Sequence, residues 1–130
     1  MSDTSSLTQA IQRYFDLVYD GDVARFDQVF RPTAQLHGYW NGEMTLLSAQ
    51  AFKESLASRP TPKSLNARRE DAVLLVDFAS DDQALTKVRV RTAAAVFIDY
   101  LTWHRIDGDW RVTSKGFHVE RLDPLVASPA

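Results

Sequence analysis

Apolar positions in the first part of the chain recur every three or four residues, at Leu7, Ile11, Tyr14, Phe15 and Val18. This spacing places them on one face of an amphipathic helix of about four turns. Gly21 is expected to end that helix, because glycine readily adopts the left-handed conformation found just after helix C-termini. Asp22 is a suitable N-cap for a second, shorter helix.

That second helix presents an apolar face made of Val23, Phe26, Val29 and Phe30. Pro32 is expected to end it, since a residue before proline is pushed out of the α region. Residues 33–39 then alternate as a strand. Asn41-Gly42 supplies the positive φ angles of a tight hairpin turn, so a second strand should follow.

Ser48 is the expected N-cap of a third helix over residues 49–58, and from Leu65 onward the hydrophobic period changes to two. The expected strands cover residues 65–79, 83–93, 95–106 and 109–120. The order is helix, helix, strand, strand, helix and then four strands. Such a pattern is typical of an α+β fold, in which a curved antiparallel sheet carries its helices on one face.

Composition narrows the class of protein. The 130 residues are 45% hydrophobic and include 11% aromatic residues, enough for one domain, which we place at residues 7–120 between a disordered segment 1–6 and a tail 121–130. Fifteen Lys and Arg against 17 Asp and Glu give a net charge of −2, which argues against nucleic-acid and anionic-membrane binding. The chain has no cysteine, no visible signal peptide and no apolar run of about 20 residues, so we expect a cytoplasmic protein without disulfides.

The last two predicted strands form a hairpin whose turn is Asp107-Gly108. A two-residue turn there would pair Trp103 with Val112, Leu101 with Ser114 and Asp99 with Gly116, all facing the helices. Asp99 would then be a carboxylate among apolar neighbours. Its burial costs several kcal/mol unless it is protonated, hydrogen-bonded or paired with a cation.

The opposite face of this hairpin and its neighbour is rich in Tyr, Thr, His and Arg rather than Lys and Glu. Aromatic residues and Arg are enriched where proteins meet, so we expect a homodimer through this face, with a merely solvated face as the alternative. The expected interface residues are Arg89, Tyr100, Thr102, His104, Arg111, Thr113 and Lys115.

With these elements in place, the chain resembles the nuclear transport factor 2-like, or cystatin-like α+β, superfamily. The matching segments are Gln12-Arg13-Tyr14, Gly21-Asp22, Phe30, Ala34, Phe97-Ile98-Asp99-Tyr100-Leu101 and Asp107-Gly108-Asp109-Trp110-Arg111-Val112. They are most similar to the branch called putative lumazine-binding, close to the SnoaL-like polyketide cyclases. The resemblance implies a conical, strongly curved sheet wrapped around three helices in the N-terminal half, often in a dimer. It specifies fold far better than function.

The ketosteroid isomerase branch gives a sharper comparison. The resemblance implies that Tyr14 and a protonated Asp99 donate hydrogen bonds to a substrate oxygen. The position of the general base falls on Gly38, which cannot take a proton. His37 is a substitute base only if a bulge turns it inward, because alternation points it away from Gly38.

We expect an apolar pocket inside the cone, capped near Trp40 and the third helix. Its expected lining is Tyr14, Val18, Phe30, Gly38, Trp40, Phe52, Val88, Asp99, Leu101, Trp103, Ser114 and Gly116. The three histidines lack metal-ligand spacing and no glycine-rich phosphate loop exists, so we expect neither a metal nor a cofactor.

Three hypotheses remain open. The first is a small-molecule binding domain anchored by Tyr14 and Asp99. The second is a SnoaL-like or isomerase-like enzyme that acts on a carbonyl compound, with Tyr14, Asp99 and His37 as catalytic residues. The third is a homodimeric assembly module whose cavity is filled by its own side chains.

Overall fold

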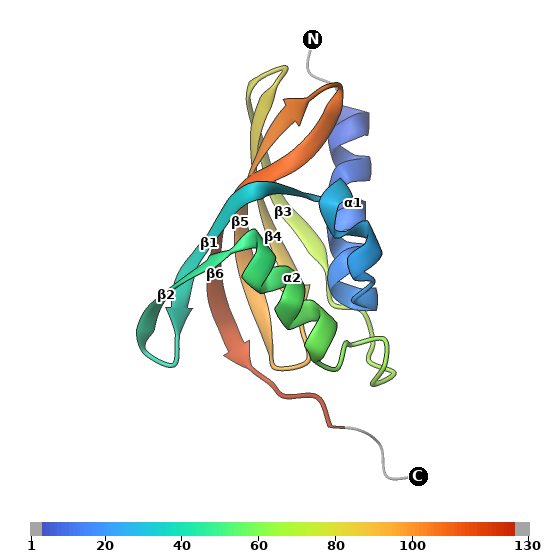
Figure 1. The fold of residues 1–130 in the computed structure, drawn as a ribbon, viewed down its shortest axis with the longest axis vertical. Coiled ribbons are helices and arrows are strands. Elements are labelled where there is room, and N and C mark those ends of the chain that lie inside the picture. Colours follow the sequence, from blue (N-terminus) through green and yellow to red (C-terminus); the bar gives the residue numbers. More distant parts are fainter. Residues whose placement is uncertain (1–3, 127–130) are drawn as a thin grey trace.

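The computed structural model describes residues 4–126 and contains two α-helices, a 3₁₀ helix and one six-stranded sheet (Figure 1). The elements in chain order are α1 (Thr4–Asp20), the 3₁₀ helix η1 (Val23–Gln28), β1 (Phe30–Trp40), β2 (Glu43–Ser48), α2 (Ala49–Ser58), β3 (Ala72–Ser80), β4 (Gln83–Arg91), β5 (Ala95–Ile106) and β6 (Asp109–Leu122). The α+β class and the element order are as predicted. Neither α1 nor α2 has the length and apolar character of a membrane-spanning helix, and residues 4–126 contain no other α-helix.

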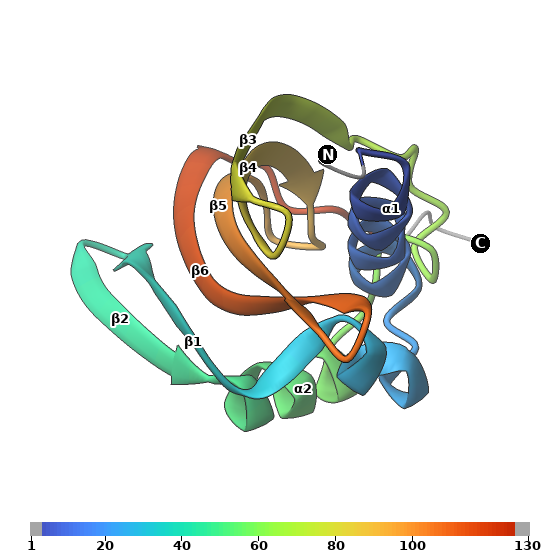
Figure 2. The ribbon, with the colours of Figure 1, turned by 90° about the horizontal axis from the view of Figure 1, so that it is seen from above.

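The sheet has the strand order β2-β1-β6-β5-β4-β3 and is not closed. It is mixed rather than wholly antiparallel, because β1 runs parallel to β6 while every other neighbouring pair is antiparallel. The sheet curves strongly, and α1 lies across the open side of the curve (Figure 2). Helix α1 packs against β4 and β6, and α2 packs against β1 and β2, so both helices cover the concave face.

Local sequence explains the helix boundaries. Asp22 accepts a hydrogen bond from the backbone N–H of Ala24, and Ser48 accepts one from Ala51 at 3.0 Å, so both predicted N-caps are present. The short second helix is a 3₁₀ helix that ends before Phe30. Phe30 is instead the first residue of β1 and stacks on Phe26 with 4.8 Å between ring centroids.

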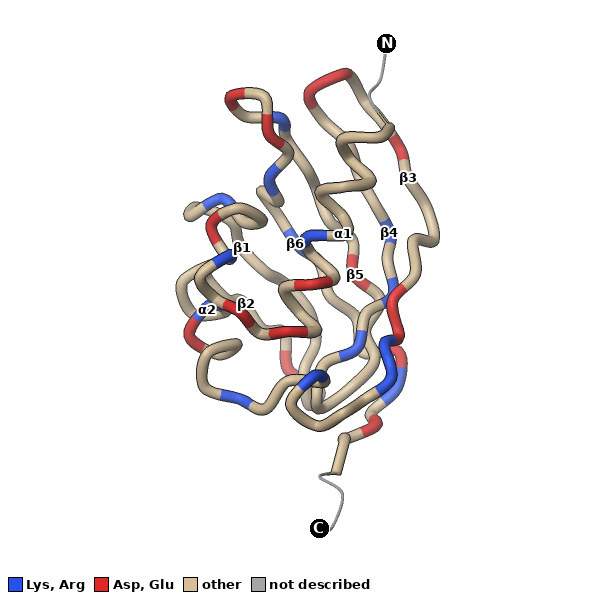
Figure 3. Tube along the Cα trace, turned by 90° about the vertical axis from the view of Figure 1, so that its right-hand side faces the viewer, with Lys and Arg blue, Asp and Glu red and all other residues tan. Residues whose placement is uncertain are grey.

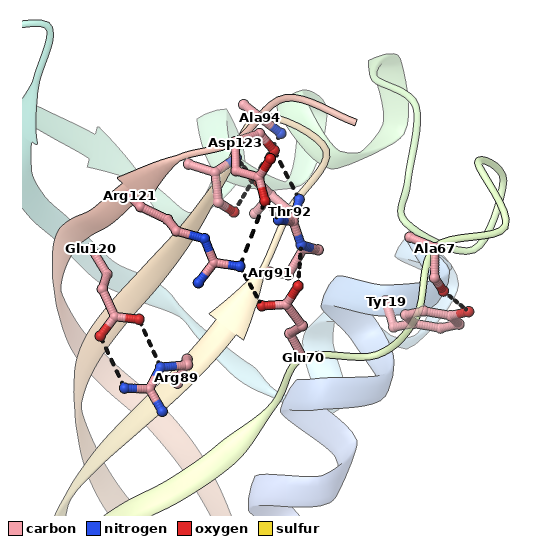
Figure 4. Close-up of polar contacts among 11 residues, drawn as sticks. Tyr19, Ala67, Glu70, Arg89, Arg91, Thr92, Ala94, Glu120, Arg121 and Asp123 are labelled. Atoms are coloured by element: carbon pink, nitrogen blue, oxygen red, sulfur yellow. Dashed lines mark hydrogen bonds and ion pairs between the residues drawn. The ribbon is translucent and has the colours of Figure 1, made fainter. Parts of the chain in front are cut away.

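The predicted strand 65–79 is wrong in its first half, since β3 begins only at Ala72. Pro62 and the following residues form hydrogen-bonded turns, and Asn66 adopts a positive φ of 54° that a strand does not allow. Tyr19 fixes this segment to α1, because its hydroxyl donates to the carbonyl of Ala67 at 2.9 Å (Figure 4).

A charged cluster joins the same segment to the end of the sheet. Arg91, only 5% exposed, donates to Glu70 and to the carbonyl of Asp123, and it also forms an ion pair with the Asp123 carboxylate (Figure 4). Arg121 reaches Glu70 at 2.9 Å. Strand β6 extends to Leu122, and beyond it the backbone N–H groups of Asp123 and Leu125 donate to the carbonyls of Ala94 and Ala93. Of the segments predicted to be disordered or a tail, residues 1–3 and 127–130 lie outside the described residues.

Elsewhere, charges of both signs are interspersed along the chain trace in the view of Figure 3. The core lies between α1 and the concave face. Its largest fully buried side chains include Trp103, Trp110, Tyr14, Phe26 and Phe30. The part of the concave face near the Asp107-Gly108 turn is filled by Trp103 and Trp110, so any cavity must lie farther along the strands.

Candidate functional site

A cavity of about 250 Å³ lies between α1, α2 and the concave side of β1, β2, β4, β5 and β6. Its apolar lining consists of Val18, Leu36, Trp40, Leu47, Phe52, Val90, Ala94, Phe97 and Phe117. Its polar lining consists of Tyr14, Thr45, Ser55, Arg59, Thr92, Asp99 and Lys115. Because Tyr14, Asp99 and Lys115 are buried and Arg59 is exposed, the first three form the inner end of the cavity and Arg59 stands at its mouth.

The inner end is organised around Asp99. The Tyr14 hydroxyl donates to Asp99 Oδ2 at 2.5 Å, and Lys115 Nζ lies 3.5 Å from the same oxygen. Asp99 and Tyr14 are both 0% exposed. The other carboxylate oxygen, Oδ1, accepts no hydrogen bond from any described residue. A buried acceptor without a partner is rare in folded proteins, and it is the polar atom here that a ligand can satisfy.

Burial shifts the protonation of the two neighbours in opposite directions. Burial raises the pKa of the Tyr14 phenol well above its usual range, and the Asp99 carboxylate raises it further, so Tyr14 keeps its proton and donates it. Burial lowers the pKa of Lys115, while the Asp99 charge acts against that shift. The Lys115 ammonium also lies 4.4 Å from the centroid of the Phe52 ring, a cation–π contact that offsets part of its desolvation.

Lys115 lies inside because β6 contains a bulge. The ladder pairs Trp103 with Val112 but Thr102 with Ser114, so Thr113 is an extra residue on β6. Beyond the bulge the predicted pairing shifts by one residue, and every side chain changes face. The expected register of Asp99 with Gly116 is therefore wrong.

Two sets of predicted positions exchange faces as a result. Lys115, expected on the outer interface, is buried beside Asp99, and Phe117 also turns inward to line the cavity. Ser114 and Gly116, expected to line the pocket, face outward with Thr102 and Tyr100.

Gly38 is buried on β1 and pairs with Phe117 of β6. A Cβ built on it would lie 2.3 Å from the Phe117 carbonyl oxygen and 2.5 Å from its ring. The close approach of two backbones therefore excludes any side chain here, which explains why no base occupies the position. His37 is exposed on the opposite face, as alternation predicts, so no bulge brings it to the cavity.

Gly38 was also predicted to line the pocket but does not line the cavity. The other nine predicted pocket residues divide into two groups. Tyr14, Val18, Trp40, Phe52 and Asp99 line the cavity. Phe30, Val88, Leu101 and Trp103 are fully buried in the core instead. The indole N–H of Trp103 donates to Thr86 Oγ1 at 2.9 Å. This bond holds the Trp103 ring in the part of the core where we had predicted the pocket.

Several lining residues were not predicted. Phe97 had a detectable signal, since it lies two positions before Asp99 and so shares its face. Arg59 had no such signal, because it follows the end of α2, where the direction of a side chain cannot be inferred from helical or strand periodicity. In residues 4–126, no three His, Cys, Asp or Glu side chains gather as a metal-binding group.

A protein-family model described as putative lumazine-binding matches residues 2–118. The search of curated proteins found no match. A solved structure of an NTF2-like protein of unknown function from Silicibacter pomeroyi is similar with a TM-score of 0.76 and 24% identity, over 89% of this chain and 94% of that chain.

Two further solved structures are similar. An NTF2-like protein of unknown function from Shewanella baltica has a TM-score of 0.76 at 17% identity, over 89% of this chain and 92% of its own. A ketosteroid isomerase-like protein from Erwinia carotovora atroseptica has a TM-score of 0.68 at 11% identity, over 90% of this chain and 95% of its own. At these identities the likeness establishes an NTF2-like fold and leaves the chemistry to the residues of the site.

Proposed function

The chain belongs to the family described as putative lumazine-binding, and from this premise we propose that it binds a small organic molecule in the cavity that ends at Asp99. Apolar cavities with a few convergent polar groups are typical of small-molecule sites. The observation that carries the proposal is the buried Asp99 Oδ1, which lacks a hydrogen-bond partner among the described residues.

The lining indicates the shape of the ligand. Trp40 stacks on Phe97 with 6.1 Å between ring centroids, and Phe117 meets Phe97 edge to face. The cavity has a volume of about 250 Å³, which is smaller than the pockets that usually bind drug-sized ligands. We therefore expect a ligand of one or two rings. A ring N–H or hydroxyl would donate to Asp99 Oδ1, and a carbonyl would accept from Lys115. Lumazine, the fused two-ring heterocycle in the family's name, carries both kinds of group.

Titration of lumazine and of simple phenols, followed by amide chemical shifts in NMR spectra, tests this function. We expect shifts along β5 and the end of β6, and weaker binding by about 10-fold in Asp99→Asn, which loses the charged acceptor. Ser114→Ala, on the outer face of the same hairpin, is the matched control and should bind normally. If Asp99→Asn is unfolded, the double variant D99N/K115M replaces it. Shifts confined to the outer face, or unchanged affinity in the Asp99 variants, would refute the proposal.

A second candidate function follows from the same atoms. Tyr14 donates its hydrogen bond to Asp99, so the two residues do not both donate to a ligand as the resemblance implied. In this arrangement Asp99 can accept a proton from the ligand, and Lys115 can donate a hydrogen bond to it. Asp99 would take a proton from the carbon next to a ligand carbonyl, and Lys115 would stabilise the enolate oxygen.

Hydrogen exchange tests this enzymatic reading. 2-Tetralone in D₂O should gain deuterium next to its carbonyl faster with the wild-type protein than with Asp99→Asn. Equal rates for the two proteins would eliminate enolisation by Asp99 and leave the binding function standing.

A further inference from the structure

Arg59 stands where two hollows meet. It is the residue directly after α2, and its extended backbone (φ −115°, ψ 156°) turns the chain toward Pro60. It lines the cavity that ends at Asp99, and it also lines a neighbouring hollow of about 330 Å³ formed with Pro60, Pro62 and Ala93. A ligand that fills the cavity as far as its mouth can therefore contact this side chain.

The charges that line the cavity do not balance. Of the residues that line it, Asp99, Lys115 and Arg59 carry formal charges. Lys115 and Asp99 neutralise each other at 3.5 Å. No described residue forms a hydrogen bond or an ion pair with the Arg59 side chain. Within residues 4–126, the positive charge of Arg59 at the mouth therefore has no counter-charge.

The two cations also act on each other. The charge of Arg59 contributes to the lowered pKa of Lys115, and partial burial lowers the pKa of Arg59 itself. An anion beside Arg59 would relieve both effects. A guanidinium presents two parallel N–H groups that match the two oxygens of a carboxylate, so this is the anion it binds with the best geometry.

We propose that the ligand is an aromatic organic acid whose carboxylate binds Arg59 at the mouth and whose hydroxyl or N–H at the other end binds Asp99. The proposal rests on the proposed binding function, because it uses the same cavity. The reverse orientation is unfavourable, since the Asp99 carboxylate would repel the acid and Lys115 is already neutralised.

Three matched pairs of probes test the proposal by titration calorimetry: 4-hydroxybenzoate, 6-hydroxy-2-naphthoate and 4′-hydroxybiphenyl-4-carboxylate, each beside its primary amide. The acid and the amide of each pair have nearly the same shape and differ in charge. The three pairs differ from one another in the length of the molecule. We expect at least one acid to bind about 10-fold more tightly than its amide. Arg59→Gln should weaken binding of the acid by about 10-fold more than binding of its amide, so that the preference for the acid is lost. Because Arg59 is exposed at the end of a helix, this variant is expected to fold normally.

Lys53→Gln is the matched control, since Lys53 lies on α2, the helix that Arg59 follows, does not line the cavity and pairs with Asp27. It should retain the preference for the acid. Equal binding of acid and amide to the wild-type protein would overturn the acid inference and leave the binding function intact. A preference that survives in Arg59→Gln would overturn it as well. Failure of all six probes to bind would overturn the acid inference, and the titration of lumazine and simple phenols would then decide whether the binding function stands.

Discussion

Lys115 Nζ lies 3.5 Å from Asp99 Oδ2 in the interior of the domain, although alternation from the Asp107-Gly108 turn places the two residues on opposite faces. The extra residue at Thr113 reverses the side-chain direction of everything that follows it on β6. One bulge therefore supplies the counter-charge for a buried carboxylate. The sequence led us to expect that Tyr14 and Asp99 would both donate hydrogen bonds to a ligand. In the structure Asp99 is instead an acceptor, and the Lys115 ammonium is the donor beside it.

The buried pair should show strong energetic coupling. Lys115→Met leaves the Asp99 carboxylate buried without a counter-ion, and Asp99→Asn leaves the ammonium in the same position. Each single change is expected to lower the free energy of unfolding by about 3–5 kcal/mol. In D99N/K115M the asparagine still accepts from Tyr14, so the double variant should be more stable than either single variant. Urea unfolding of the four proteins measures the coupling, and additive losses would contradict it.

Tyr14→Phe should change both stability and its dependence on pH. Loss of the hydrogen bond to Asp99 is expected to cost about 1.5–3 kcal/mol at neutral pH. Because the folded-state pKa of Tyr14 is raised, the unfolded chain alone loses this proton above about pH 10. The stability that Tyr14 provides is therefore complete below pH 10 and declines above it, by at most about 1.4 kcal/mol per pH unit.

Unfolding curves of the wild-type and Tyr14→Phe proteins between pH 7 and pH 11 measure this difference. The gap between them should be constant at first and shrink above about pH 10. A gap that stays constant to the highest pH would show that Tyr14 titrates as it does in the unfolded chain.

Gly38→Ala should destabilise the protein, since its methyl group would meet the backbone and ring of Phe117 at 2.3–2.6 Å. Forced separation of β1 and β6 is expected to cost about 1–3 kcal/mol or more. Gly116→Ala is the matched control on the partner strand, because its nearest neighbour would be Tyr100 Cβ at 3.9 Å. Thermal unfolding compares the two variants. Equal midpoint temperatures for the two variants would show that β1 and β6 leave room for a methyl group at Gly38.

The outer face of the sheet remains a predicted homodimer contact, now without Lys115. Tyr100 is 44% exposed on this face. Arg89 forms a bidentate ion pair with Glu120, in which Nε and Nη2 lie 2.7 and 2.9 Å from the two carboxylate oxygens. We expect light scattering to give the mass of a dimer, and Tyr100→Glu to shift it toward the monomer. Val126→Glu, at an 83% exposed position near the end of the chain, should leave the dimer intact. A monomeric wild-type protein would refute the contact.

Prediction from the sequence worked where local chemistry decides the structure. The caps at Asp22 and Ser48 and the turns at Asn41-Gly42 and Asp107-Gly108 are present, because each depends on a side chain or a φ angle within a few residues. Alternation placed Asp99 inward, and its contact with Tyr14 unites two positions that the family resemblance had singled out.

Prediction failed where distant strands decide the structure. The parallel pairing of β1 with β6 depends on curvature of the whole sheet and leaves no local signal. The bulge at Thr113 has no glycine to mark it. Once it was missed, Lys115 was assigned to the wrong face and Ser114 to the cavity. Arg59 lies outside any periodic element, so its role at the mouth emerged only from the folded chain.

The parallel pairing of β1 with β6 also affects how the site forms. Leu36 and Phe117 line one cavity but belong to strands that are far apart in the sequence, so the cavity is enclosed only after a long loop has closed and β1 has paired with β6. Contacts of this kind slow folding, because loop-closure entropy must be overcome before they form. The wall of the cavity is therefore incomplete until β1 pairs with β6. Occupancy of the cavity reports on completion of the fold, and a bound ligand stabilises the complete fold over every intermediate that lacks β6.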